Sequence, residues 1–120
     1  MSRDEAAYVA DMLEACERVR EYTAGLDAAG LRGDRRTVDA VLRNLEVLGE
    51  AAKRVSISIR AGVPQIPWRE IAGMRDVLIH DYFGVDLDIV CDVVFVKLPA
   101  LRLALEKLLR QLDEGTPAKA

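Results

Sequence analysis

Apolar residues recur every three or four positions along most of the chain, which is the spacing of a helix face. The first such segment follows Ser2 and Glu5, which have the spacing of a capping box, and it continues to Leu26. A second begins after Asp34, an N-cap residue type, and runs to about residue 60. The pattern therefore predicts two long amphipathic helices in the first half of the chain.

A short stretch at the end of the second segment has a different period. Residues 55–59 alternate between apolar and polar side chains, as a strand does. No other alternating stretch offers a partner, and a lone strand would leave its backbone polar groups unpaired. We therefore expect this stretch to be helical.

Glycine and proline divide the second half of the chain. Pro67 suits the first residue of a third helix, and Gly84 should end that helix. A fourth helix is expected after Asp86 or Asp88, either of which could cap it. Pro99 falls inside this last segment, so a kink or break is expected near residue 98.

These elements predict an all-α fold, an up-down bundle of four to five helices. The 120 residues suffice for one domain, expected over residues 1–113, with a frayed tail at 114–120. No apolar run approaches the length of about 20 residues needed to span a bilayer, so no membrane is expected as a partner. The first residues lack a signal-peptide pattern, which makes the cytoplasm the expected location.

The residues that commonly bind metals are sparse. Cys16 and Cys91 lie far apart and form no C-x-x-C pair, so we expect two small buried side chains. His80 is the one histidine of the chain, and zinc prefers nitrogen and sulfur ligands. Neither a metal nor a cofactor is expected.

Charge is distributed unevenly along the chain. Residues 1–29 carry three arginines against seven acidic residues, whereas residues 30–75 carry nine basic residues against five acidic ones. The basic middle could attract phosphate, and it could equally be a solvated helix face. The overall charge of −3 conceals this difference.

His80 lies in the stretch GMRDVLIHDYF, five residues after Arg75. On a helical wheel at 100° per residue, Arg75 falls in the apolar stripe of Ile71, Met74 and Leu78. A buried guanidinium needs an anion, carbonyl groups or a second subunit. His80 points about 140° away from Arg75, so one regular helix cannot aim both at a single atom.

Two arrangements would bring these side chains together: the helix ends between them, or two copies of the chain meet and share a site. Asp76 precedes His80 by one helical turn, where its carboxylate could hold the imidazole and raise the pKa of His80. A histidine, an arginine and an orienting carboxylate can cleave RNA without a metal, because the 2′-hydroxyl supplies the nucleophile. The residues alone also allow a purely structural histidine.

Several blocks in order resemble the HepT-like toxins of the HEPN superfamily. They are Arg43–Lys53 (RNLEVLGEAAK), Ile66–Arg75 (IPWREIAGMR), Leu78–Asp86 (LIHDYFGVD) and the Leu98-Pro99 pair. The resemblance covers most of the chain. It implies a homodimeric HEPN bundle whose two R-x4-H motifs share a cleft that cleaves RNA without metal.

Residue roles follow from the resemblance position by position. Arg75 and His80 match the catalytic pair, and Asp76 matches the polar position after the arginine. Tyr82 matches the tyrosine to which a nucleotidyltransferase antitoxin, MntA, attaches AMP. The resemblance thus implies a ribonuclease toxin of a type VII toxin–antitoxin system, with RNA as substrate and an MntA-like protein as partner.

The chain departs from the family at two positions. Asp76 stands where asparagine is frequent, which adds negative charge beside an anionic substrate, and Cys91 replaces a frequent tryptophan. Asn44 and Glu50 lie in a matching block, but we interpret them first as packing and hydrogen-bonding residues. The alternative functions are a non-catalytic module that binds nucleotide or docks on the transferase, and a plain dimerisation domain.

Overall fold

The computed structural model describes residues 5–80 and 84–114. The long helices are α1 (Glu5–Tyr22), α3 (Arg35–Arg54) and α8 (Leu98–Asp113). The shorter elements are α2 (Ala28–Arg32), α4 (Ile57–Gly62), α5 (Trp68–Ala72), α6 (Met74–Leu78), β1 (Ile79–His80), β2 (Gly84–Val85), α7 (Leu87–Asp92) and the π-helix η1 (Val93–Lys97).

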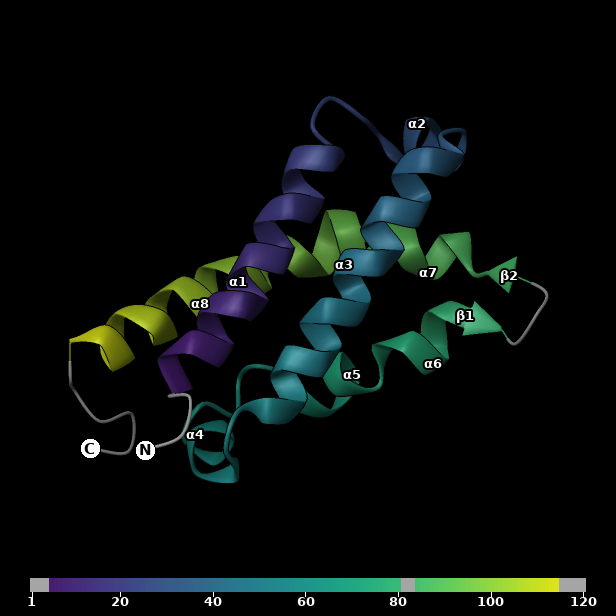
Figure 1. Cartoon of the computed structure of the whole chain (residues 1–120). Coiled ribbons are helices and arrows are strands. Elements are labelled where there is room, and N and C mark those ends of the chain that lie inside the picture. The colour runs from purple at the N-terminus through teal and green to yellow at the C-terminus, as the bar shows by residue number, and fades with distance from the viewer. Residues whose placement is uncertain (1–4, 81–83, 115–120) are drawn as a thin grey trace.

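The long helices build the body of an all-α bundle, which confirms the predicted all-α fold class. α1 packs against α3 along one side and against α8 along the other (Figure 1). The core between them is apolar and includes Val9, Met12, Leu45, Leu48 and Leu105, each at most 1% exposed. None of the described helices is long and apolar enough to cross a membrane.

Side-chain caps set several helix starts. Asp34 accepts a hydrogen bond from the Thr37 backbone N–H at the start of α3, and Asp86 accepts one from the Ile89 N–H at the start of α7. The cap at Asp34 was predicted, and Asp86 was one of the two caps predicted for the later helix, the other being Asp88. Ser56 in the same way caps α4, so the chain bends after Arg54 into a separate short helix. The helical prediction for residues 55–59 is therefore right, but the predicted single helix to about residue 60 is wrong.

The first helix is shorter than predicted, since the predicted segment ran to Leu26. α1 ends at Tyr22, and α2 follows after a turn in which Gly25 has a φ of 81°. Asp27 caps α2 by accepting a hydrogen bond from the Gly30 N–H. The sequence pattern did not predict this short helix.

The break predicted at Pro99, near residue 98, does not occur, but the hydrogen-bonding pattern of the helix changes there. A proline at this position cannot donate to the carbonyl four residues before it, and its ring crowds that carbonyl. The chain widens into the π-helix η1, where the Leu98 N–H donates to the Val93 carbonyl. Helical backbone therefore continues from α7 into α8 without a break.

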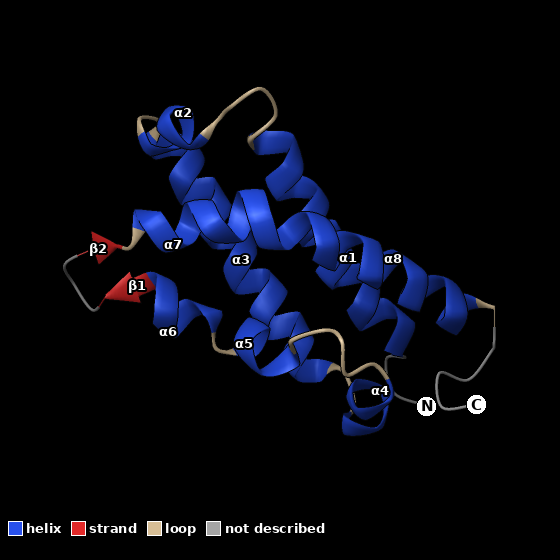
Figure 2. Cartoon of the chain, turned by 180° about the vertical axis from the view of Figure 1, so that it is seen from behind, coloured by secondary structure: helices blue, strands red, loops and turns tan. Residues whose placement is uncertain are grey.

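The predicted third helix is two short helices and half of a hairpin. Gly73 separates α5 from α6, and α6 ends at Leu78 instead of continuing towards Gly84. β1 and β2 then pair antiparallel, with Ile79 opposite Val85 and His80 opposite Gly84. This hairpin lies at the opposite end of the molecule from the start of α1 and the end of α8 (Figure 2).

Both cysteines are buried and free, as predicted. Burial raises the pKa of the Cys16 thiol to about 12. A thiol with that pKa stays protonated at neutral pH and is a poor nucleophile. Cys16 thus contributes to the buried face of α1 rather than to chemistry.

Candidate active site

Arg75 projects from α6 into solvent, with 67% of its side chain exposed. The prediction that it lies on the buried side is therefore wrong. The helical wheel assumed one regular helix, whereas the helix is interrupted at Gly73, two residues before Arg75. Ile71, Met74 and Leu78 do form a buried stripe, as predicted.

The guanidinium of Arg75 has an anionic partner within the same chain. Its Nε donates a hydrogen bond to Oε2 of Glu46 at 2.9 Å. Glu46 lies in the middle of α3, 29 residues earlier in the sequence, and its side chain is 33% exposed. Sequence analysis missed Glu46, because nothing local in the sequence connects the two positions.

A close approach of helices brings this pair together. A Cβ placed on Gly49, in α3, would lie 2.9 Å from the carbonyl oxygen of Ile71, in α5. Real side chains do not come this close, so a glycine is needed for α5 to lie at this distance. The contact fixes α5, and with it the start of α6 and Arg75, against the face of α3 that carries Glu46.

His80 follows Arg75 by five residues but lies in a different element. Its backbone belongs to β1, so the helix ends between Arg75 and His80, as the first of the two arrangements requires. The side chain of His80 lies outside the described part of the chain. Tyr82, the predicted modification site, lies outside the described residues.

Asp76 is exposed on α6, next to Arg75. The expected one-turn helical spacing between Asp76 and His80 does not occur, because the helix ends at Leu78. An orienting role for Asp76 therefore has no support from helical geometry.

Arg75 and Glu46 both line a small hollow of about 160 Å³. Glu46, Glu50 and Asp76 contribute carboxylates to its lining, whereas Lys53 and Arg75 contribute the cations. Lys53 pairs with Glu50 at 3.2 Å. Of the two cations that line this hollow, Arg75 lies closer in sequence to His80 than Lys53 does.

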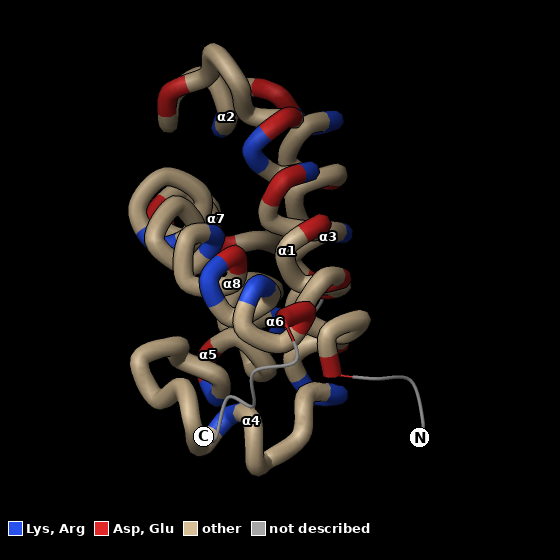
Figure 3. Tube along the Cα trace, turned by 90° about the vertical axis from the view of Figure 1, so that its left-hand side faces the viewer, with Lys and Arg blue, Asp and Glu red and all other residues tan. Residues whose placement is uncertain are grey.

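The basic middle segment does not form a uniform basic surface. Basic and acidic positions are interleaved along α3 (Figure 3). Within the described residues, Arg32 pairs with Asp88, and Lys53 and Arg75 pair with glutamates of α3. This arrangement favours the solvated helix face over an extended phosphate-binding surface.

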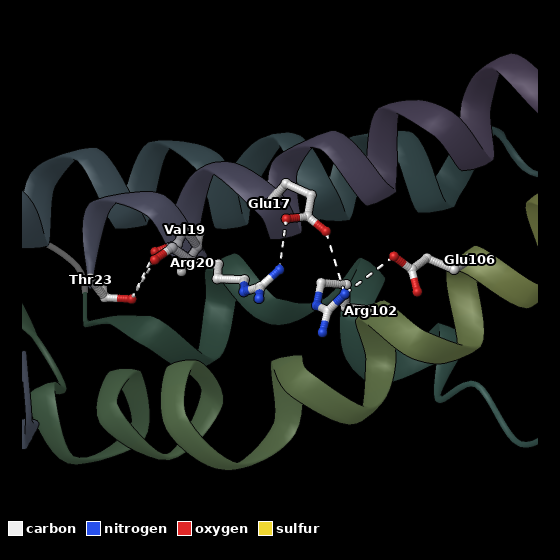
Figure 4. Close-up of polar contacts among 6 residues, drawn as sticks. All are labelled: Glu17, Val19, Arg20, Thr23, Arg102 and Glu106. Carbon is white, nitrogen blue, oxygen red and sulfur yellow. Dashed lines mark hydrogen bonds and ion pairs between the residues drawn. The ribbon is translucent and has the colours of Figure 1, made fainter. Parts of the chain in front are cut away.

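A second polar cluster joins α1 to α8 (Figure 4). Arg102 lies 3.2 Å from a carboxylate oxygen of Glu106 and 3.6 Å from one of Glu17, and Glu17 also pairs with Arg20. The side chain of Arg102 is 21% exposed. Because all these cations have carboxylate partners, we interpret the cluster as structural.

Asn44 and Glu50 behave as packing and hydrogen-bonding residues. Asn44 is buried, and its amide donates to the Ala40 carbonyl within α3. Glu50 is exposed and pairs with Lys53. In the described parts of the chain, no three His, Cys, Asp or Glu residues gather closely enough to hold a metal ion.

The Ribonuclease HepT-like family matches residues 12–108, a range that includes Glu46, Arg75 and His80. The chain belongs to the HepT-like ribonuclease family. The probable ribonuclease HepT of Thermococcus cleftensis is 41% identical over 108 residues, which are 90% of this chain and 98% of that protein.

Two proteins of Methanocaldococcus jannaschii are also similar to this HepT-like chain. One, named "Putative RNase", is 38% identical over 112 residues, which are 93% of this chain and 97% of the relative. The other, named "Gamma-glutamylcyclotransferase and putative RNase", is 37% identical over 115 residues, which are 96% of this chain and 52% of the relative. No solved structure matches the chain.

Proposed function

We propose that this HepT-like ribonuclease cleaves RNA without a metal, using Arg75 and His80 in a cleft formed by two copies of the chain. Family membership supports ribonuclease activity and RNA as the substrate. The exposed guanidinium of Arg75 is the single observation that carries the choice of site. It stands on the last helix before the strand that contains His80.

The chemistry assigns one task to each residue. The 2′-hydroxyl of the RNA attacks the adjacent phosphorus, and the bond from phosphorus to the 5′-oxygen breaks. His80 moves a proton from the attacking hydroxyl to the leaving 5′-oxygen, and such proton transfer raises the rate about 10²- to 10⁴-fold. Arg75 stabilises the negative charge that grows on the phosphoryl oxygens.

A second copy is part of the proposal because one protomer supplies only one Arg75 and one His80. The hairpin that carries His80 lies at one end of the molecule (Figure 1). A dimer contact at that end would bring two R-x4-H motifs into one cleft. Two guanidinium groups could then hold the phosphate that is cut.

The direct test is cleavage of a labelled RNA by purified protein in the presence of EDTA. We expect the wild type to cleave and Arg75→Ala and His80→Ala to lose at least about 100-fold in rate. Thermal melting shows whether each variant is folded. A wild type that binds RNA but does not cut it would favour a non-catalytic binding module, and one that does not bind RNA would favour a plain dimerisation domain.

We further propose that the protein is the toxin of a type VII toxin–antitoxin system, silenced by AMP attached to Tyr82. An adenylate two residues from His80 adds bulk and negative charge, which would repel RNA phosphate. Co-expression with an MntA-like nucleotidyltransferase should therefore add AMP to the intact mass and relieve growth arrest. Tyr82→Phe should show no added mass, and an unmodified wild type would contradict this part of the proposal.

A further inference from the structure

We propose that Glu46 is a positioning residue for RNA cleavage: it fixes the orientation of the Arg75 guanidinium. This inference rests on the proposed role of Arg75. It adds a residue from α3 to a site otherwise built from a single continuous stretch of sequence. Glu46 itself is not proposed to touch the RNA.

The atoms of the ion pair carry the argument. Glu46 accepts its hydrogen bond from Nε of Arg75, not from either Nη. Among the residues whose side chains are described, no hydrogen bond or ion pair involves an Nη atom of Arg75. Because Glu46 binds Nε, the geometry of the pair allows the two terminal nitrogens to donate to a pair of phosphoryl oxygens while Nε stays bound to Glu46.

The two partners differ in how firmly the fold holds them. Arg75 is a long, exposed side chain on a helix of only five residues. Glu46 is two-thirds buried and lies inside a helix of 20 residues, on the part of α3 that α5 approaches closely at Gly49. Glu46 is thus the better-fixed partner, so it restricts Arg75 rather than the reverse.

The expected consequence is a slower chemical step with little change in RNA binding. An unrestrained arginine keeps its charge and still attracts phosphate, but it must find the correct orientation in the transition state. Misplacement of a catalytic group by about 1 Å can cost about 100-fold in rate. Removal of the Glu46 carboxylate should therefore lower the cleavage rate more than the affinity.

Glu50 provides a matched control. It is also a glutamate of α3, it lines the same hollow, and its carboxylate pairs with Lys53. It differs from Glu46 in making no ion pair with Arg75. Glu50→Ala removes the same charge from the same helix.

The test compares Glu46→Ala, Glu46→Gln, Glu50→Ala and Arg75→Ala in single-turnover cleavage of a labelled RNA, together with RNA affinity and melting temperature. Glu46→Ala should slow cleavage about 10- to 100-fold while affinity changes by less than about threefold. Glu46→Gln keeps an oxygen that can accept from Nε, so its rate should be intermediate. Glu50→Ala should cleave at about the wild-type rate.

Each other outcome has a distinct meaning. Wild-type rates in both Glu46 variants, alongside a loss in Arg75→Ala, would overturn the role of Glu46 and leave the proposed function intact. Equal losses in Glu46→Ala and Glu46→Gln, with parallel drops in affinity and melting temperature, would show a structural role instead and also overturn it. A wild-type rate in Arg75→Ala would refute the proposed catalytic site, whatever the Glu46 variants do.

Discussion

At the residue scale, the carboxylate of Asp34 accepts hydrogen bonds from both the backbone and the side chain of Thr37. One carboxylate oxygen accepts from the Thr37 backbone N–H at 3.1 Å, and the other accepts from the Thr37 hydroxyl at 2.8 Å. These two hydrogen bonds favour the ionised carboxylate and hold the pKa of Asp34 below its ordinary value of 3.8. The stability of the start of α3 therefore depends on whether the carboxyl group of Asp34 is ionised.

This cap predicts a pH-dependent effect on stability. The lowered pKa means that the stabilisation is complete above about pH 4 and is lost as pH falls through the folded-state pKa. Asp34→Ala should lower the melting temperature by a few degrees at pH 7, and the difference from wild type should shrink below pH 4.

Asp34→Asn provides the control for this prediction, because asparagine also caps helices but does not titrate. Its melting temperature should lie near that of the wild type at pH 7. Melting curves followed by circular dichroism from pH 7 to pH 2.5 measure all three proteins. If the difference in melting temperature between wild type and Asp34→Ala stayed constant over this pH range, the pH-dependent role of the Asp34 cap would be contradicted.

Contacts between residues close in sequence could be predicted, whereas contacts between distant residues could not. The caps at Asp34 and Asp86 were predictable, because each involves a residue three positions along the chain. The partner of Arg75 was not, because Glu46 is brought to it only by the packing of α3 against α5 and α6. The helical wheel failed at Arg75 for a related reason, since it presumed a continuous helix through Gly73.

At the element scale, the approach of α3 and α5 depends on one missing side chain. Gly49→Ala would place a methyl group 2.9 Å from the Ile71 carbonyl oxygen, so α5 would have to move away. We expect a loss of about 1–3 kcal/mol in unfolding free energy from this overpacking, reduced by the better helix propensity of alanine. RNA cleavage should fall as well, because α6 carries Arg75 and follows α5 directly.

Gly33→Ala is the comparison for this prediction. An added Cβ there would meet its nearest neighbour, the Ala29 carbonyl oxygen, at an ordinary 3.5 Å. Urea unfolding of the two variants and the wild type measures the difference. If Gly49→Ala were as stable and as active as Gly33→Ala, the close approach would not control the position of α6.

Element boundaries were the part of the fold that periodicity predicted least well. The apolar pattern of the long helices repeats over many turns, so the sequence predicted α1, α3 and α8. α2, α6, β1 and β2 are too short to establish a period of their own. Their positions depend on where glycines and caps interrupt the chain and on what the long helices leave uncovered.

At the scale of the whole molecule, the proposed cleft requires two copies of the chain. The cleavage rate per protomer should therefore fall when the protein is diluted below the dissociation constant of the dimer. Two copies joined by a flexible linker should keep their rate on dilution. Sedimentation of the same samples reports the dimer fraction, and a constant rate per protomer in samples shown to be monomeric would contradict the shared cleft.

The fold class and the candidate pair Arg75 and His80 came from the sequence, through helical periodicity and the resemblance to HepT-like toxins. The arrangement around the pair did not. A resemblance transfers residues position by position, whereas the Glu46 contact is a property of how three helices meet. Tertiary packing is needed to show which exposed acid lies against the arginine.

The π-helix between α7 and α8 has a consequence for insertions and deletions. Removing one residue from Val93–Lys97 could restore regular α-helical bonding, but it would rotate the helix on one side of the cut by about 100° relative to the other. Either the leucines of α8 that face α1 would turn towards solvent, or α7 would lose its contact with α6. Point substitutions on exposed positions of this stretch leave that register unchanged, so its length is under stricter constraint than its composition.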